Sequence, residues 1–155
     1  MGPSTPSPPP GREARRSFPS SLESVQQLLD WMEDVRFPEI SEDTWVQAKT
    51  AIIEGFTNAV RHAHADRVPP PPVHVRIVRS PDALDLEVID SGAPFRMQAA
   101  APHPDQDRHW GLIMLQRLQE RYGWTIEYES MGPQGNVLRI HRSLAQDSPP
   151  GESLR

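Results

Sequence analysis

The sequence contains no cysteine and no long apolar run. Without cysteine, disulfide bonds, thiolate metal sites and cysteine nucleophiles are all excluded. The apolar stretches fall well short of the roughly 18 residues that cross a bilayer, and the opening residues, MGPSTPSPPPGREARRSF, lack the apolar core of a secretion signal. We therefore expect a soluble protein of the reducing cytoplasm that does not enter a membrane.

The chain is also short of positive charge. Its formal net charge is -5 and its isoelectric point is about 5.6, so most of its surface would repel nucleic acid and anionic membranes. Any anionic ligand must then be held by a local group of residues. At 155 residues the chain is long enough for one domain with a single core, and two domains are not expected.

Proline, in contrast, is abundant and concentrated in three stretches. Because proline lacks an amide donor and fixes its own backbone, these stretches predict a disordered head over residues 1–19, a stiff connector at residues 69–72 and a disordered tail over residues 144–155. The head would also suit a proline-rich ligand for another domain, although such runs are common at termini. We expect the folded domain over residues 20–143.

Helical periodicity occurs in three segments. The first opens with Ser20 three residues before Glu23, which is the spacing of a capping box. The second is the longest and has Ser41 as its expected N-cap. The third ends at Gly123, a typical C-terminal cap. The predicted helical segments are residues 20–37, 41–65 and 110–123.

Alternation of apolar and polar residues predicts four strands. VHVRIVRS and ALDLEVID are separated by the dipeptide PD and predict a hairpin, whereas WTIEYES and NVLRIH are joined by the turn MGPQG. Residues 93–109 have no usable periodicity and are expected to form a mobile loop. Four strands with one apolar face need a cover, which three helices supply. We therefore expect an α/β fold: a two-layer sandwich of a mostly antiparallel mixed sheet covered by three helices.

The longest predicted helix carries Glu54, Asn58 and His62 at intervals of four, away from the apolar arc that would face the core. Such positions commonly form a solvated face. Glu54 and Asn58 also place oxygen ligands and a base side by side, which suits magnesium with its bound phosphates. Gly55 costs a helix about 1 kcal/mol relative to alanine, so either a ligand or a packing neighbour must approach closely there. A zinc site is disfavoured, because His62 and His64 are two residues apart and point in different directions.

The segment VIDSGAPF places Asp90 at the end of an apolar strand, followed by Gly92 and Phe95. A carboxylate there would accept a hydrogen bond from an amino group such as that of adenine, and Gly92 would let the ring approach the backbone. An Asp-Ser-Gly turn that closes the strand explains the same residues. In RHWGLIML, Gly111 precedes a helix whose free amides would receive phosphate, although one glycine before a helix is weak evidence.

In this order and spacing, the three segments resemble the ATP-binding domain shared by bacterial anti-sigma serine kinases, sensor histidine kinases, gyrase and Hsp90. EGFTNAVRHA resembles the N box, DSGAPF resembles the first glycine box, and HWGLIML resembles what remains of the second. The resemblance covers nearly all of residues 20–143 and implies a Bergerat-type fold that binds ATP and Mg2+. It implies nucleotide contacts for Asn58, His62, Asp90, Gly92, Phe95, Arg108, Gly111, Leu112 and Asn136.

Within that superfamily, a stand-alone chain without a separate phosphoacceptor helix resembles the anti-sigma type rather than a sensor histidine kinase. This resemblance implies that Asn58 binds the magnesium ion on the phosphates, that Asp90 reads the adenine amino group, and that Glu54 is the catalytic base. The acceptor serine or threonine would belong to a STAS-domain anti-sigma factor antagonist, and a sigma factor partner and a homodimer are implied in the same way. The sequence has neither G-x-x-x-x-G-K-[ST] nor the H-R-D and D-F-G set, so an ATP site must be of the N-box kind.

The sequence departs from this family pattern at two places. Arg108, His109 and Trp110 stand where relatives carry glycines, and bulky residues cannot copy a glycine turn around phosphates. Arg108 either compensates by its charge or is an ordinary surface arginine. Asn136 stands near a common threonine, where its amide either reaches adenine through water or forms a turn with Gly135. The alternative function is therefore a degenerate module that docks to a regulatory protein, with Trp110 as a candidate anchor.

Overall fold

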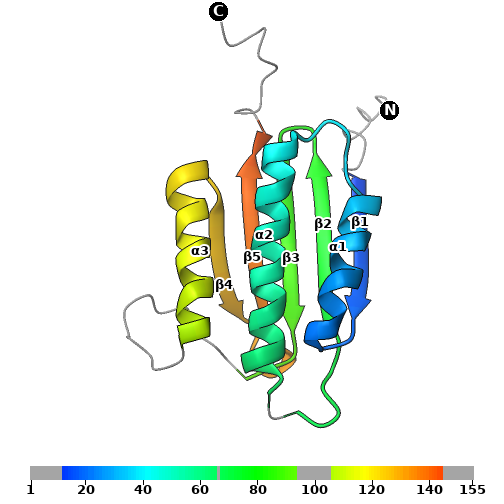
Figure 1. Cartoon of the computed structure of the whole chain (residues 1–155), viewed down its shortest axis with the longest axis vertical. Coiled ribbons are helices and arrows are strands. Elements are labelled where there is room, and N and C mark those ends of the chain that lie inside the picture. The colour runs from blue at the N-terminus through cyan, green and yellow to red at the C-terminus, as the bar shows by residue number, and fades with distance from the viewer. Residues whose placement is uncertain (1–11, 66, 94–105, 145–155) are drawn as a thin grey trace, which may run out of the picture.

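The computed structural model describes residues 12–65, 67–93 and 106–144, with the backbone alone over 106–112. In these ranges five strands form one sheet in the order β1-β2-β3-β5-β4, and three helices cover one of its faces (Figure 1). The strands are β1 (Arg12–Phe18), β2 (Val73–Ser80), β3 (Ala83–Asp90), β4 (Thr125–Ser130) and β5 (Asn136–Ser143), and the helices are α1 (Val25–Asp34), α2 (Glu42–Asn58) and α3 (Gln106–Tyr122).

The two-layer α/β fold expected from the sequence is confirmed. All four pairings between the described strands are antiparallel, so this part of the chain contains no parallel pair. β2 and β3 form the predicted hairpin, in which Ser80 pairs with Ala83 across a two-residue loop. β5 lies between β3 and β4, and its first residue, Asn136, pairs with Asp90 at the end of β3. The topology therefore brings two predicted site residues together.

β1 corrects the predicted domain boundary. The sequence predicts a disordered segment over residues 1–19, whereas Arg12–Phe18 forms an edge strand that pairs along its whole length with β2. Only Phe18 of this strand is buried, at 1% exposure. An edge strand with solvated faces needs little apolar alternation, so the pattern that marks central strands is missing here. At the other end, the Leu144 amide donates to the Asp82 carbonyl at 2.8 Å, one residue beyond the predicted domain.

The ends of the helices follow local capping signals, with one exception. The Ser41 hydroxyl accepts a backbone N–H of the first turn of α2 at 3.1 Å, as predicted. Gly123 follows α3 with a φ of 75°, the left-handed conformation of a C-terminal cap. The capping box predicted at Ser20 is wrong, because Ser21 is the cap and accepts the Glu23 amide at 3.2 Å ahead of a short 3-10 turn, Leu22–Ser24.

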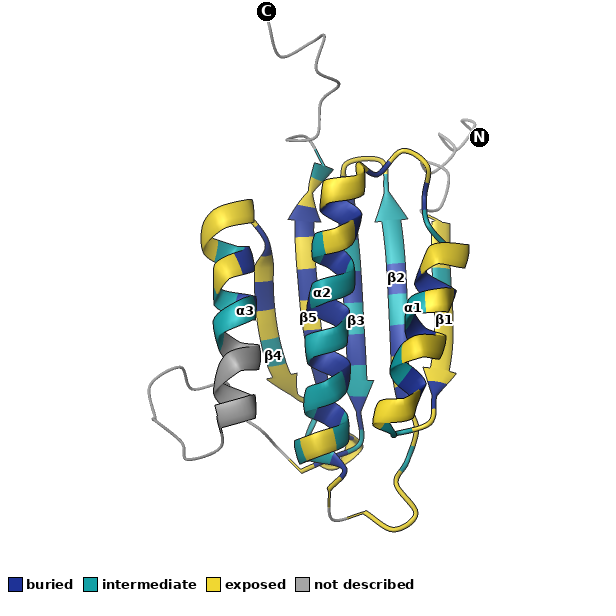
Figure 2. Ribbon diagram, in the orientation of Figure 1, coloured by how far each residue is buried: buried dark blue, intermediate teal, exposed yellow. Residues whose placement is uncertain are grey.

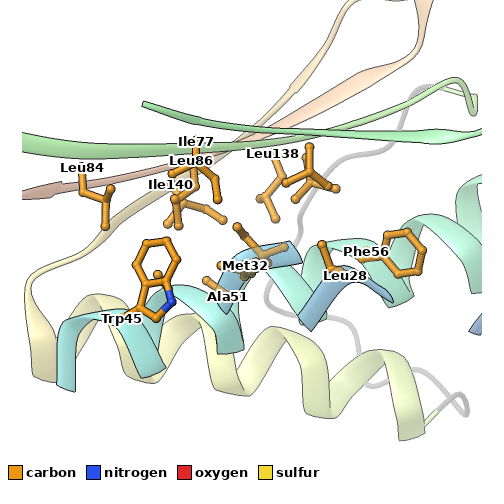
Figure 3. Packing of buried hydrophobic residues seen from close by; sticks show 14 of the residues in the cluster. Leu28, Met32, Trp45, Ala51, Phe56, Ile77, Leu84, Leu86, Leu138 and Ile140 are labelled. Atoms are coloured by element: carbon orange, nitrogen blue, oxygen red, sulfur yellow. The ribbon is translucent and has the colours of Figure 1, made fainter. Parts of the chain in front are cut away.

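The core lies between the helices and the covered face of the sheet (Figure 2). In Figure 3, Trp45 rises from α2 toward Leu84 and Ile140 of the sheet. Gly55 also faces the sheet: a Cβ at this position would lie 2.7 Å from Cδ2 of Leu138. Its lack of a side chain therefore serves close helix-to-sheet packing rather than the approach of a ligand. No described helix has the length and hydropathy of a membrane span.

Phe18→Ala tests whether β1 belongs to the domain. The variant should lower the free energy of unfolding by about 3–5 kcal/mol, because the ring packs edge-on against Trp31 and Phe56 at centroid distances of 5.6 and 6.3 Å. Leu22→Ala is the control, since Leu22 is 45% exposed and its loss should change stability by less than about 0.5 kcal/mol. Urea denaturation followed by circular dichroism measures both, and equal stability of the two variants would contradict the burial of Phe18.

Candidate functional site

The candidate site forms where the end of α2 meets the end of β3. After Asn58 the helix continues into a π-helical turn, Ala59–Ala63, in which the His64 amide donates to a carbonyl five residues back at 2.9 Å. Such turns are rare in proteins, and those that occur are often found at functional sites. A Cβ on Gly92, just past β3, would lie 2.5 Å from the carbonyl oxygen of Ala63. Gly92 is therefore required for contact between the helix end and the strand end, whatever ligand it also meets.

Glu54 and Asn58 lie one turn apart on α2, and both are partly buried. His62 is also partly buried but lies in the π turn, so the α-helical spacing that aligns the first two side chains does not extend to it. Burial raises the pKa of the Glu54 carboxyl, with the charge of Arg61 acting in the opposite direction. A carboxylate whose pKa is raised suits a general base.

The donor atoms of Glu54 and Asn58 fit magnesium in their chemistry. A carboxylate and an amide oxygen are hard ligands of the kind that Mg2+ prefers, and Mg2+ usually takes its remaining ligands from water and substrate phosphates. Within the described residues, no group of three or more His, Asp or Glu side chains is placed to hold a metal ion. A magnesium ion at Asn58 would therefore depend on bound phosphates to complete its coordination.

Asp90 is the buried acid of the site. It is 3% exposed and lies on the helix-facing side of β3, as the last residue of the alternating pattern. Its Oδ1 accepts hydrogen bonds from the Gly92 amide at 2.8 Å and from Nδ2 of Asn136 at 2.9 Å, and its Oδ2 accepts from the Tyr128 hydroxyl at 2.8 Å. A carboxylate offers about four acceptor positions. Counting the described residues, one position on Oδ2 is available for a donor from outside.

The Asp-Ser-Gly turn expected at Asp90 is present. The bond from the Gly92 amide to Oδ1 closes the expected Asp-Ser-Gly turn. Asn136 begins β5 instead of forming the expected turn with Gly135: its side chain is fully buried and donates to both Asp90 and the Ala93 carbonyl, the latter at 2.9 Å. Local sequence does not predict this bond, because it depends on the pairing of β3 with β5.

Tyr128 and His64 are the site residues that sequence reasoning missed. Tyr128 lies on β4, two strands from Asp90, on the same face as the buried Ile126. Alternation along the strand was the one signal for its inward direction. His64 is 2% exposed, and its Nε2 accepts the Ser91 amide at 2.9 Å. No local pattern distinguishes this histidine from its neighbours.

The start of α3 differs from the prediction. The helix begins at Gln106, four residues before the expected start at Trp110. The free amides of a helix belong to its first four residues, and Gly111 and Leu112 lie beyond them, inside α3. Arg108 is within the first turn, but its side chain and those of Gly111 and Leu112 lie outside the described residues, as does Phe95. The contacts predicted for these four residues stay predictions.

The described residues form an α/β fold, an antiparallel sheet with helices on one face and a buried acid at the end of β3. The family model of the histidine kinase-like ATPase domain matches residues 18–142. The chain belongs to this family. A comparison with curated proteins finds no match.

One solved structure shows the same fold at low identity, and two others align less closely. The histidine kinase domain of the blue-light activated histidine kinase EL346 from Erythrobacter litoralis aligns with a TM-score of 0.56 and 17% identity, over 80% of this chain and 61% of that one. Acinetobacter baumannii histidine kinase AdeS aligns with a TM-score of 0.49 and 16% identity, over 85% of this chain and 68% of that one. The mycobacterial sensor histidine kinase MprB aligns with a TM-score of 0.45 and 17% identity, over 84% of this chain and 97% of that one. At such identities, the first of these comparisons shows the fold alone.

The two tyrosines of the chain provide a matched test of the Asp90 hydrogen bonds. Tyr128→Phe should lower the free energy of unfolding by about 1.5–3 kcal/mol, because it removes a donor to a buried carboxylate. Tyr122→Phe should leave stability nearly unchanged, since Tyr122 is 44% exposed. Chemical denaturation at neutral pH compares them, and a loss no larger for Tyr128→Phe than for Tyr122→Phe would argue against the bond.

Proposed function

We propose that the chain binds ATP with Mg2+ and transfers the γ-phosphate to a serine or threonine of a STAS-domain anti-sigma factor antagonist. The observation that carries the proposal is the buried Asp90, whose Oδ2 accepts one hydrogen bond from the described residues and whose turn lies against the end of the helix that bears Glu54 and Asn58. A buried acid at the end of β3, together with a carboxylate and an amide one turn apart on α2 in a histidine kinase-like ATPase domain, supports recognition of a nucleotide and its metal.

Asp90 has the chemistry to select adenine. Its remaining acceptor position on Oδ2 would take a hydrogen bond from the exocyclic amino group of the base, a donor that guanine does not offer at the same ring position. The amide of Asn136 and the hydroxyl of Tyr128 already hold the carboxylate in a fixed orientation. A preset acceptor loses little freedom when the base binds, which favours affinity.

Glu54 would serve as the general base of the transfer step. The acceptor hydroxyl oxygen attacks the γ-phosphorus, the bond from that phosphorus to the β,γ-bridging oxygen breaks, and the hydroxyl proton passes to the Glu54 carboxylate. The amide oxygen of Asn58 would help to hold the metal ion. When bound, Mg2+ neutralises charge on the transferring phosphoryl group.

The anti-sigma resemblance also suggests the biological partners. We propose a STAS-domain antagonist as substrate, a sigma factor or another regulator as the protein sequestered in its absence, and a homodimer acting in the cytoplasm. The net charge of -5 favours protein partners over direct contact with nucleic acid or an anionic membrane.

A second candidate function is a docking module that binds nucleotide weakly or not at all. The early start of α3 at Gln106 favours this alternative, because it leaves Gly111 inside the helix rather than in a turn around phosphates. Such a module would work through contact with a regulatory protein. Direct measurement of ATP binding separates the two candidates.

Asp90→Asn tests the adenine contact. The variant should weaken ATP binding by about ten- to a hundred-and-fifty-fold in isothermal titration calorimetry with Mg2+, because it removes a charged acceptor. Asp85→Asn on the same strand is the control: Asp85 lies on the uncovered face of the sheet, where it pairs with His141, and its replacement should not change ATP affinity. Both variants are checked for folding by circular dichroism. Unchanged affinity in folded Asp90→Asn would refute the role of Asp90.

Glu54→Gln tests the chemistry. With labelled ATP, Mg2+ and a candidate STAS-domain antagonist, the variant should retain ATP binding but lose about a hundred- to ten-thousandfold in transfer rate. Glu42→Gln, at the exposed start of the same helix, is the control. Because the pKa of Glu54 is raised, the wild-type rate should increase with pH through values above the ordinary range of a glutamate. Transfer that is equally fast in Glu54→Gln, or absent from wild type, would refute the kinase.

A further inference from the structure

His64 links three segments that are distant in the sequence. It follows the π turn at the end of α2, where its Nε2 accepts the Ser91 amide at 2.9 Å and its Nδ1 lies 2.9 Å from the Ser20 hydroxyl. The imidazole is 2% exposed. Ser20 precedes α1, and Ser91 lies between Asp90 and Gly92. The histidine therefore joins the start of the first helix, the end of the second and the turn that carries the buried acid.

The hydrogen bonds fix the protonation state of the ring. A backbone N–H can only donate, so Nε2 must be unprotonated to accept the Ser91 amide. The neutral ring then carries its proton on Nδ1 and donates it to the Ser20 hydroxyl. A proton on Nε2 would oppose two N–H groups at 2.9 Å and break the bond to Ser91.

The Asp90 turn is held through both backbone polar groups of Ser91. His64 takes the Ser91 amide, and Nη1 of Arg67 donates to the Ser91 carbonyl at 2.8 Å. Gly92, the next residue, abuts Ala63 with no room for a Cβ. The segment after α2 thereby sets the position of Asp90 relative to the helix that carries the proposed base and metal ligand.

We propose that His64 is a positioning residue of the nucleotide site: with its proton on Nδ1 it locks the Asp90 turn against the end of α2, and protonation of Nε2 releases the turn. The proposal rests on the proposed ATP binding. It adds a residue that touches neither base nor phosphate and that couples the adenine-reading acid to Glu54 and Asn58. Acid conditions should therefore weaken nucleotide binding through His64.

The groups that face His64 support a neutral ring at neutral pH. Burial lowers the pKa of the imidazole, Asp90 of β3 acts to raise it, and Arg67 of the following connector acts to lower it. Ser20, the partner on the side of α1, is uncharged. The lock should therefore persist at neutral pH and open only below the ordinary range of histidine, near about 6.5. Because the unfolded chain takes up this proton first, the His64 contribution to stability is full above that range and declines as pH falls through it.

Matched variants test the lock through ATP affinity. His64→Gln keeps an uncharged acceptor within reach of the Ser91 amide, whereas His64→Ala has none, and His74→Gln changes an exposed histidine on the uncovered face of the sheet. As pH falls from about 6.5 toward about 5, wild type and His74→Gln should lose about tenfold in ATP affinity by calorimetry, the equivalent of one lost hydrogen bond. His64→Gln should show a clearly flatter profile, and His64→Ala should be about two- to tenfold weaker already at pH 7.5.

An NMR titration of the ligand-free wild-type protein tests the lock independently of ATP. The Ser91 amide should shift and lose protection from hydrogen exchange as the His64 ring titrates. A Ser91 amide that ignores this titration would overturn the lock, as would identical ATP profiles for wild type and both folded His64 variants. If wild type binds no ATP while Ser91 still responds, the lock exists and the proposed function fails, so the two failures are distinguishable.

Discussion

The burial of one carboxylate is the constraint on which the site depends. Removing a charge from water costs several kcal/mol unless its acceptor positions are filled, and Asp90 is 3% exposed. Its donors come from its own turn, from Asn136 on β5 and from Tyr128 on β4. The donors on Asn136 and Tyr128 reach it only if β5 lies beside β3 and β4 lies beyond β5. The hydrogen bonds that hold the site's acid therefore require this order of strands.

The uncovered face of the sheet is stabilised in a different way. A chain of ion pairs crosses all five strands there, from Glu13 through Arg76, Glu87 and Arg139 to Glu129. Each such pair is weak alone, but together they let a face without helices meet water. This explains why sequence periodicity predicted the three helices and four strands yet missed β1. The strand contributes charges to this face and one ring to the core, so it lacks the alternation by which the half-buried strands were found.

The site was predictable where it depends on local sequence. The strand end at Asp90 and the one-turn spacing of Glu54 and Asn58 follow from periods of two and 3.6 residues. Tyr128 and His64 were not predictable in this way, because each acts on a segment that lies 38 or 27 residues away along the chain. Their partners are set by strand order and by the π turn, neither of which a short motif encodes. Long-range pairing, rather than residue type, decides what these side chains do.

The two halves of the proposed site are built from separate elements. The half proposed to read adenine is complete among the described residues: an acid on β3 is oriented from β4 and β5 and fixed against the end of α2. The half proposed to handle phosphate depends on α2 and on the start of α3, where the sequence has Arg108, His109 and Trp110 and the helix begins at Gln106. The bonds that the described residues make to Asp90 come from its own turn, β4 and β5, so we expect changes at the start of α3 to act on phosphate chemistry more than on base recognition. The kinase and the docking module are thus two proposals for the same fold and the same buried acid. They differ in whether the first turn of α3 supports phosphate binding.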